Sequence, residues 1–141
     1  YVLMYAGCPI HWVSKLQTEI AVSTAEAEYI ALSQSLREVI PLMSMRKELK
    51  KAFPIEIQIP NFNCTVHEHE DNQSCISMAT TQKFSPRTKH IALKYHHFRS
   101  YVNSKQIEIH YINTHDQLAD CLTKPLGANL FFDLRKMLMG W

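Results

Sequence analysis

The strand and helix signals of this chain follow one another in an order that suits a mixed α/β (α+β) fold. Three short β-prone segments come first, at 1–5, 10–13 and 18–22, and turns join them. Helix and strand signals then alternate to the end of the chain. An antiparallel meander followed by alternating helices and strands predicts a mixed sheet with helices packed on its faces.

The longest helical region has a proline in its middle. Ser23 or Thr24 can cap its start, and Glu26 supplies the negative charge that favours a first turn. Pro41 has no N–H to donate, so it disfavours a continuous helix. The sequence therefore predicts that one helix ends before Pro41 and that a second one begins there.

The other signals predict shorter elements. Apolar residues three to four positions apart at Ile91, Tyr95, Phe98 and Val102 predict one buried stripe on a long helix over 89–104. The remaining predicted elements are a helix over 41–52, a strand over 64–70, a helix over 73–79, a strand over 106–112, a helix over 116–124 and a helix over 129–139.

Bulk composition excludes several classes of protein. With 141 residues, of which 46% are hydrophobic and 20% charged, the chain suits one globular domain. Its four cysteines lack C-x-x-C spacing, which argues against a disulfide scaffold and favours a reducing, intracellular setting. No apolar stretch is long enough to span a bilayer, so we expect no membrane partner. The net charge of +2 neither indicates nor forbids nucleic-acid binding.

Glu28 is the first of three acidic residues that could carry chemistry. Its same-face helical neighbours include Ala25, Ala31 and Leu32, so it lies on the face expected to pack inward. A carboxylate there needs a metal ion or a partner charge. The alternative is a rim position from which Glu28 bends out to water.

Asp71 stands between a predicted strand and a predicted helix. Ligands gather at the carboxyl ends of strands in open α/β sheets, which favours a functional role. A plain helix cap is the alternative. Because Asn72 and Ser74 can also cap the helix, Asp71 is available for a functional role.

Asp120 lies on the predicted helix over 116–124, one turn after Asp116. Two aspartates at this spacing repel each other, and a nearby cation would reverse the effect. The alternative is that Asp116 starts the helix and Asp120 faces solvent. The sequence contains no G-x-S-x-G, P-loop or H-E-x-x-H motif, and carboxylates without clustered cysteine or histidine suit a hard ion such as Mg²⁺.

Histidines and basic residues give weaker candidates. His67 and His69 share a strand face and His96-His97 lie in a predicted helix, but nothing fixes four zinc ligands, so structural or surface histidines are favoured. His115 precedes Asp116 and could reach a bound phosphate. The most basic tract is either a phosphate-facing surface or a solvated helix face. Its members are Arg87, Lys89, His90, Lys94, His96, His97 and Arg99.

Four stretches together resemble the ribonuclease H segment of copia-type retrotransposon polyproteins. They occur in the family's order and with family-like separations, and the resemblance spans nearly the whole chain. The stretches are Ser23 to Leu32 (S-T-A-E-A-E-Y-I-A-L), Glu70 to Ser74 (E-D-N-Q-S), Arg87 to Ile91 (R-T-K-H-I) and Asp116 to Leu126 (D-Q-L-A-D-C-L-T-K-P-L).

The resemblance implies a ribonuclease H-like fold, a five-stranded mixed sheet with flanking helices, over 1–126, followed by a C-terminal helical tail over 127–141. It implies a metal-dependent endoribonuclease that hydrolyses the RNA strand of an RNA–DNA hybrid, with four acids holding two Mg²⁺ (or Mn²⁺) ions. Carried over by motif, three of these catalytic metal ligands are Glu28, Asp71 and Asp120, with His115 as a further catalytic candidate.

The resemblance also implies partners and a location. The partners are an RNA–DNA hybrid, recognised by its shape and 2′-hydroxyls, and a covalently linked reverse transcriptase domain upstream, with no small-molecule cofactor. The location is intracellular, in a cytoplasmic virus-like particle or the nucleus. The candidate nucleic-acid contacts are Asn72, Gln73, Arg87, Lys89 and His90.

The family's first acid lies on a strand that would precede Tyr1. In the family this strand is the centre of the sheet, between the strands predicted here at 1–5 and 64–70. Because Tyr1 already begins a strand, we expect the chain to be an internal piece of a longer protein that lacks this element. We therefore expect residues 1–141 alone to bind metal poorly and to show no appreciable nuclease activity.

Two other hypotheses stay open at this point. The chain could be a non-catalytic relic or nucleic-acid-binding module of a decayed retroelement, since the segment 65–70 is polar where a central strand should be apolar. It could also be an integrase-like member of the same superfold. The early helix position of Glu28 suits ribonuclease H better, because integrases do not place their glutamate there.

Overall fold

A computed structural model describes residues 1–52, 64–68, 72–81 and 95–141 of the chain. The described part has a mixed α+β fold, as predicted. Its elements, in chain order, are β1 (Val2–Tyr5), β2 (Cys8–Trp12), α1 (Thr24–Ala52), β3 (Cys64–Glu68), α2 (Gln73–Thr80), α3 (Arg99–Asn103), β4 (Ile107–Tyr111), the 3₁₀ helices η4 (Thr114–Asp116) and η5 (Leu118–Leu122), and α4 (Ala128–Met139).

The four described strands form two separate two-stranded sheets. Strands β1 and β2 make an antiparallel hairpin, whose two-residue turn places Ala6 and Gly7 at positive φ (50° and 79°). Strands β3 and β4 pair in parallel, with Cys64 opposite Ile107. Among the described residues no strand pairing joins the two sheets, so the predicted single mixed sheet is not what these strands form.

Residues 18–22 do not form the predicted third strand. Ile20 and Val22 are exposed there, and the Val22 N–H donates to Oε2 of Glu26 at 3.0 Å. β-Branched residues favour a strand only when neighbours pack and pair with them. The apolar composition of this segment was therefore a poor guide, and the antiparallel meander reduces to a hairpin.

Helix α1 runs without a break through Pro41 for 29 residues, so the predicted division into two helices is wrong. Leu36, Val39 and Met43 are buried on one stripe that continues past the proline, while Pro41 itself is exposed. An interior proline costs about 3 kcal/mol because a backbone hydrogen bond is lost. Burial of this continuous stripe offsets that cost.

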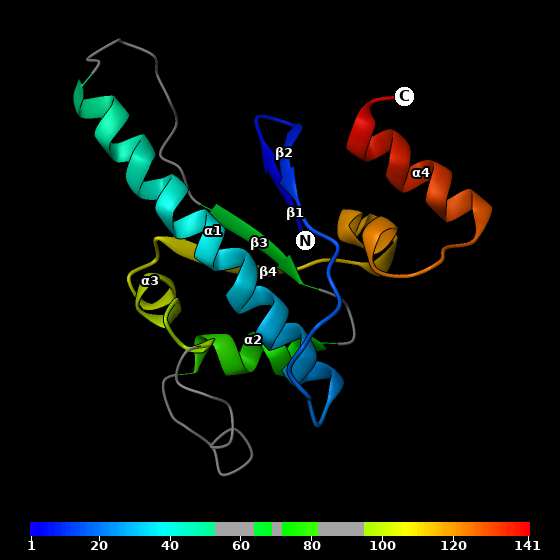
Figure 1. Cartoon of the computed structure of the whole chain (residues 1–141), viewed down its shortest axis with the longest axis horizontal. Coiled ribbons are helices and arrows are strands. Elements are labelled where there is room, and N and C mark those ends of the chain that lie inside the picture. Colours follow the sequence, from blue (N-terminus) through cyan, green and yellow to red (C-terminus); the bar gives the residue numbers. More distant parts are fainter. Residues whose placement is uncertain (53–63, 69–71, 82–94) are drawn as a thin grey trace.

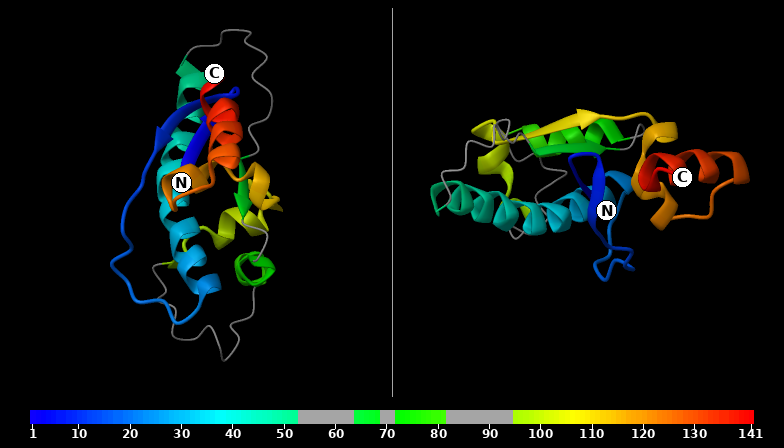
Figure 2. Two further views of the ribbon diagram at one scale, coloured as in Figure 1. Left: turned by 90° about the vertical axis from the view of Figure 1, so that its right-hand side faces the viewer. Right: turned by 90° about the horizontal axis from the view of Figure 1, so that it is seen from above.

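Helix α1 is the longest element and crosses the molecule diagonally in Figure 1. Seen from above, it forms one layer, and β3, β4 and α2 lie opposite it (Figure 2, right). The buried apolar core combines residues of α1 with residues of α2, β4 and the segment before α3. Its members are Tyr29, Ile30, Leu32, Leu36, Val39, Met43, Cys75, Ala79, Tyr95, Phe98 and Ile107.

The predicted helix over 89–104 is confirmed only in its last part. Within the described residues it covers Arg99–Asn103, and residues 89–94 lie outside them. The predicted stripe holds in this part, because Tyr95 and Phe98 are buried in the core. Helix α3 begins only at Arg99, four residues after Tyr95.

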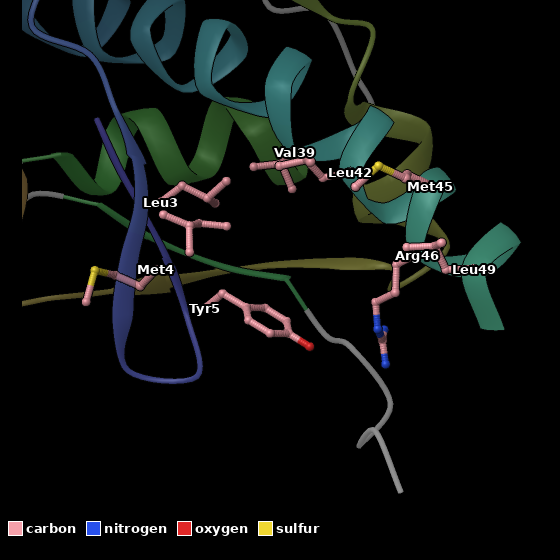
Figure 3. Close-up of a pocket in the computed structure, with 9 residues that line it drawn as sticks. Leu3, Met4, Tyr5, Val39, Leu42, Met45, Arg46 and Leu49 are labelled. Carbon is pink, nitrogen blue, oxygen red and sulfur yellow. The ribbon is translucent and has the colours of Figure 1, made fainter. Parts of the chain in front are cut away.

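The β1–β2 hairpin meets the second half of α1 around an apolar cavity of about 210 Å³. Leu3 and Tyr5 of β1 face Leu42 and Leu49 of α1 across it (Figure 3). Helix α4 contacts β2 and η5 and lies to one side of α1 (Figure 1). None of the described helices combines the length and apolarity that crossing a membrane requires.

Candidate functional site

The parallel pairing of β3 and β4 brings two chain segments to one edge of their sheet. Strand β3 ends at Glu68 opposite the last residue of β4, Tyr111. Because parallel strands point the same way, the residues that follow both strands leave from this edge, where ligands gather in open α/β sheets. These residues include Asn72 at the start of α2 and, after β4, the short helices η4 and η5.

Glu26 closes the start of α1, as predicted. Its backbone N–H donates to Oγ of Ser23 at 3.2 Å, and its Oε2 accepts the Val22 N–H at 3.0 Å. This arrangement is a variant of the capping box, because the serine accepts from the glutamate N–H while the glutamate accepts from the residue before the serine. The buried carboxylate of Glu26 is therefore used in structure.

Glu28 lies on the part of α1 that packs beside the start of α2. It is half-buried, and its Oε2 atom is inaccessible to solvent. Its neighbour Tyr29 is fully buried, and burial raises the pKa of the Tyr29 hydroxyl, with Arg99 opposing the rise and Cys75 of α2 adding to it. Tyr29 of α1 and Cys75 of α2 are both buried in the same core, where the two helices contact each other. Glu28 thus points neither fully inward nor fully to water.

Asn72 occupies the N-cap position of α2, but its side chain makes no capping hydrogen bond. The prediction that Asn72 can cap this helix is therefore wrong, and its backbone (φ −120°, ψ 38°) is not the extended conformation that capping residues adopt. The side chain is only 1% exposed, and neither its Oδ1 nor its Nδ2 has a hydrogen-bond partner among the described residues. A buried amide in this state costs about 1–3 kcal/mol, so this position suits a polar partner.

Asp120 is buried at 5% exposure on η5, so the alternative that it faces solvent is wrong. Nζ of Lys124 lies 2.8 Å from its Oδ2. The pKa of the neighbouring Cys121 thiol is raised by burial and, to a lesser degree, by the negative charge of Asp120. Asp120 therefore places a carboxylate in a poorly solvated region, beside the half-exposed ammonium group of Lys124.

The predicted α-helix over 116–124 is two 3₁₀ helices instead. Gln117 is extended (φ −76°, ψ 94°) and separates η4 from η5. Asp116 and Asp120 are therefore not one turn apart on one helix, and the predicted repulsion between them does not apply. The side chain of Ser14 fixes η5 from outside by donating to the Leu122 carbonyl at 2.7 Å.

Tyr29, His96 and Arg99 form a partly buried polar network that no local sequence pattern indicates. The Tyr29 hydroxyl lies 2.6 Å from Nδ1 of His96 and accepts a hydrogen bond from Nε of Arg99 at 3.1 Å. Arg99 also donates to the Met78 carbonyl at 2.6 Å. Since Arg99 ties α2 to α1, its predicted place on a phosphate-facing or solvated surface is wrong.

The remaining predicted site residues divide into two groups. His115 is exposed on η4, and its backbone N–H donates to Oδ1 of Asn113 at 3.0 Å, while Gln73 is exposed at the start of α2. His97 lies 3.4 Å from Oγ of Ser33, which fits a structural histidine. The others, or their side chains, lie outside the described residues. These are His67, His69, Asp71, Arg87, Lys89, His90 and Lys94.

The described residues therefore hold two of the three predicted acids, Glu28 and Asp120. In this part of the chain no three histidine, cysteine, aspartate or glutamate side chains gather as a metal site. Asp71 lies outside the described residues, so the predicted meeting of the three carboxylates stays a prediction.

Comparison with known proteins shows what the chain is similar to. It is 34% identical to a retrovirus-related Pol polyprotein from transposon TNT 1-94 of Nicotiana tabacum, over 99% of its own length and 10% of that protein. It is 35% and 34% identical to retrovirus-related Pol polyproteins from transposons RE2 and RE1 of Arabidopsis thaliana, over 93% of its length and 8% of theirs.

No protein-family model and no solved structure matches the chain. The chain spans about a tenth of the length of the curated relatives it matches. Nearly all of this chain is therefore homologous to one segment of the retrovirus-related Pol polyproteins of plant transposons.

Proposed function

We propose that residues 1–126 belong to a ribonuclease H domain, which hydrolyses the RNA strand of an RNA–DNA hybrid within a retrotransposon polyprotein. The observation that carries the proposal is the buried carboxylate of Asp120 on a segment that follows β4, at the carboxyl edge of the β3–β4 pair. Homology to transposon Pol polyproteins supports this choice over an unrelated metal enzyme.

Glu28 and Asp120 fit the donor chemistry of a hard divalent cation such as Mg²⁺. Both carry carboxylate oxygens that are largely withdrawn from water, and carboxylate oxygens are the protein ligands that Mg²⁺ uses. Asp71 would be the third ligand in this proposal. When bound, such an ion supplies activation of water and stabilisation of the leaving oxygen.

In this proposal Lys124 compensates the charge of a carboxylate, and Asn72 binds substrate. Lys124 balances the charge of Asp120, and its half-exposed side chain can turn to solvent when a cation arrives. Asn72 offers a buried amide without a hydrogen-bond partner among the described residues, and an amide can hydrogen-bond a ribose hydroxyl or a phosphate oxygen.

A chimeric protein tests the proposal. Among the described strands β1 pairs only with β2, and β3 only with β4, so each could accept another strand. Residues 1–141 are joined behind the segment that directly precedes the aligned region in the Nicotiana tabacum polyprotein. We expect this chimera to cleave end-labelled RNA in a hybrid when Mg²⁺ is added, whereas residues 1–141 alone show no appreciable cleavage.

Matched variants identify the carboxylates. Glu28→Gln and Asp120→Asn, each in the chimera, should reduce the cleavage rate by roughly a hundredfold or more, a loss typical of removing one group that stabilises charge in a transition state. Glu26→Gln removes a carboxylate two residues from Glu28, and we expect it to retain most of the activity because Glu26 acts in the capping box. A folded chimera that binds the hybrid without cutting it would favour a non-catalytic binding module instead.

A further inference from the structure

The C-terminal end of α4 holds an arginine between two aromatic rings. The guanidinium carbon of Arg135 lies 5.2 Å from the ring centre of Phe132 and 5.4 Å from that of Trp141. We call these three residues the α4 clamp. Both distances are in the range of cation–π contacts.

Local sequence builds this clamp. Phe132 and Arg135 are three residues apart on α4 and so share one face of the helix. Gly140 ends α4 in the left-handed conformation (φ 82°), and its N–H donates to the Lys136 carbonyl at 2.8 Å. This turn lets the chain reverse, so that the ring of Trp141 lies over Arg135.

The clamp presents ring surface and charge to solvent. Phe132 is 54% exposed and Trp141 is 70% exposed. Arg135 forms no hydrogen bond or ion pair with any described residue, and its Nε is buried without a partner. Asp133, the only acid on α4, is two residues from Arg135 and therefore not on the same side of the helix.

We propose that the α4 clamp binds single-stranded nucleic acid. Unpaired bases stack on the exposed faces of Trp141 and Phe132, and a backbone phosphate pairs with the guanidinium of Arg135. A duplex offers no unpaired bases to the rings, and an acidic peptide satisfies Arg135 but leaves the rings uncovered. Single strands satisfy both features, and Lys136 in the last turn of α4 adds positive charge. The clamp contains neither Glu28 nor Asp120, so this proposal does not depend on the proposed nuclease activity.

Tryptophan fluorescence tests the proposal directly. The chain has two tryptophans, so Trp12→Phe leaves Trp141 as the only reporter. Residues 1–141 with this change are titrated with an unstructured oligothymidylate and with an oligouridylate of about twelve nucleotides, a length within the site sizes of single-strand binders. We expect quenching of Trp141 that saturates, and affinity that falls as salt rises.

Substitutions separate stacking from charge. Arg135→Gln and, in a protein that keeps Trp12, Trp141→Ala should each weaken binding about tenfold, measured by anisotropy of a labelled oligonucleotide. Trp141→Phe keeps an aromatic ring and should retain most of the affinity. Lys15→Gln is the control, because it removes the same charge from an exposed side chain outside the clamp.

Three results would overturn the proposal. They are a blunt duplex of equal length that binds as tightly as the single strand, a glutamate-rich peptide that competes equally well, and unchanged affinity in both Trp141→Ala and Arg135→Gln. Circular dichroism checks that α4 is intact. Trp141 follows the helix, so Trp141→Ala decides the matter even if Arg135→Gln disturbs folding.

Discussion

The two halves of α1, divided at Pro41, pack in different ways. The first half presents Tyr29 and Leu36, both 0% exposed, to α2 and to the segment before α3. The second half faces the β1–β2 hairpin, and there Met45 and Leu49 are 51% and 49% exposed around the apolar cavity. The first half is therefore built into a closed core, whereas the second half contributes Met43 to that core and otherwise rests on an open contact.

The hydrogen bonds at the two halves of α1 also differ in how far apart along the chain their partners lie. In the first half Tyr29 bonds His96 and Arg99, which come from about 70 positions further along the chain. The hairpin is closed by local contacts instead, such as the bond from the Val13 N–H to the Tyr1 carbonyl at 3.0 Å. Long-range contacts with satisfied hydrogen bonds should hold most of the stability, so the folded state is anchored at the start of α1, beside the candidate site.

The largest expected effect comes from truncating the core of the first half. Phe98 is fully buried against Tyr29, so Phe98→Ala should lower the free energy of unfolding by about 3–5 kcal/mol. Ile10 on the hairpin is half exposed, and Ile10→Ala should cost less than about 1 kcal/mol. Urea unfolding followed by circular dichroism measures both, and equal losses would abolish the contrast between the two halves.

Replacing the proline between the halves should act in the opposite direction. Pro41→Ala restores an N–H to the middle of α1 and should raise the free energy of unfolding by up to about 3 kcal/mol. Thermal unfolding gives the sign. A loss of stability would mean that the geometry imposed by Pro41 is needed for α1 to reach both the core and the hairpin.

The polar network of the first half can be tested by removing a single oxygen. Tyr29→Phe leaves His96 and Arg99 without the hydroxyl they contact and should cost about 1–3 kcal/mol. Tyr101→Phe is the matched control, because no hydrogen bond of the Tyr101 hydroxyl occurs among the described residues. Similar losses of unfolding free energy in Tyr29→Phe and Tyr101→Phe would show that the hydrogen bonds of the network contribute little to stability.

We expect the stability of the chain to depend on pH in the alkaline range, and Tyr29→Phe tests this prediction. Burial raises the pKa of Tyr29 above its ordinary value of 10.0, so the folded state holds this proton more tightly than the unfolded state does. The protonated Tyr29 hydroxyl therefore stabilises the folded state fully below pH 10, and this stabilisation is lost as pH rises through the folded-state pKa. Unfolding measured from pH 9 upwards should show this decline in the natural chain and less of it in Tyr29→Phe.

The smallest effect concerns the cap of the first half. Ser23→Ala removes the acceptor of the Glu26 N–H and should cost about 1 kcal/mol. Thr24→Ala, at an exposed position one residue later, should change stability by less than half of that. If both variants unfold at the same urea concentration as the natural chain, the start of α1 is held by packing and not by its cap.

Local signals predicted much of the fold and part of the candidate site. The spacing of Tyr95 and Phe98 predicts their burial, and Ser23 with Glu26 predicts the capped start of α1. Local composition is a wrong predictor where an element needs a partner from a distant part of the chain. Residues 18–22 had the composition of a strand but are unpaired as one, and Gln117 divides a stretch whose composition suited one helix.

The sequence by itself determined the mixed fold class, the capped start of α1 and the acidic residues worth testing, because periodicity and capping act between residues a few positions apart. Tertiary structure alone decided that α1 passes through Pro41, that Asp120 is buried and that Tyr29 joins His96 to Arg99. Each of these outcomes depends on groups that are distant along the chain. Such groups meet only in the folded state, where the free energy of burying them can outweigh the local preferences of the sequence.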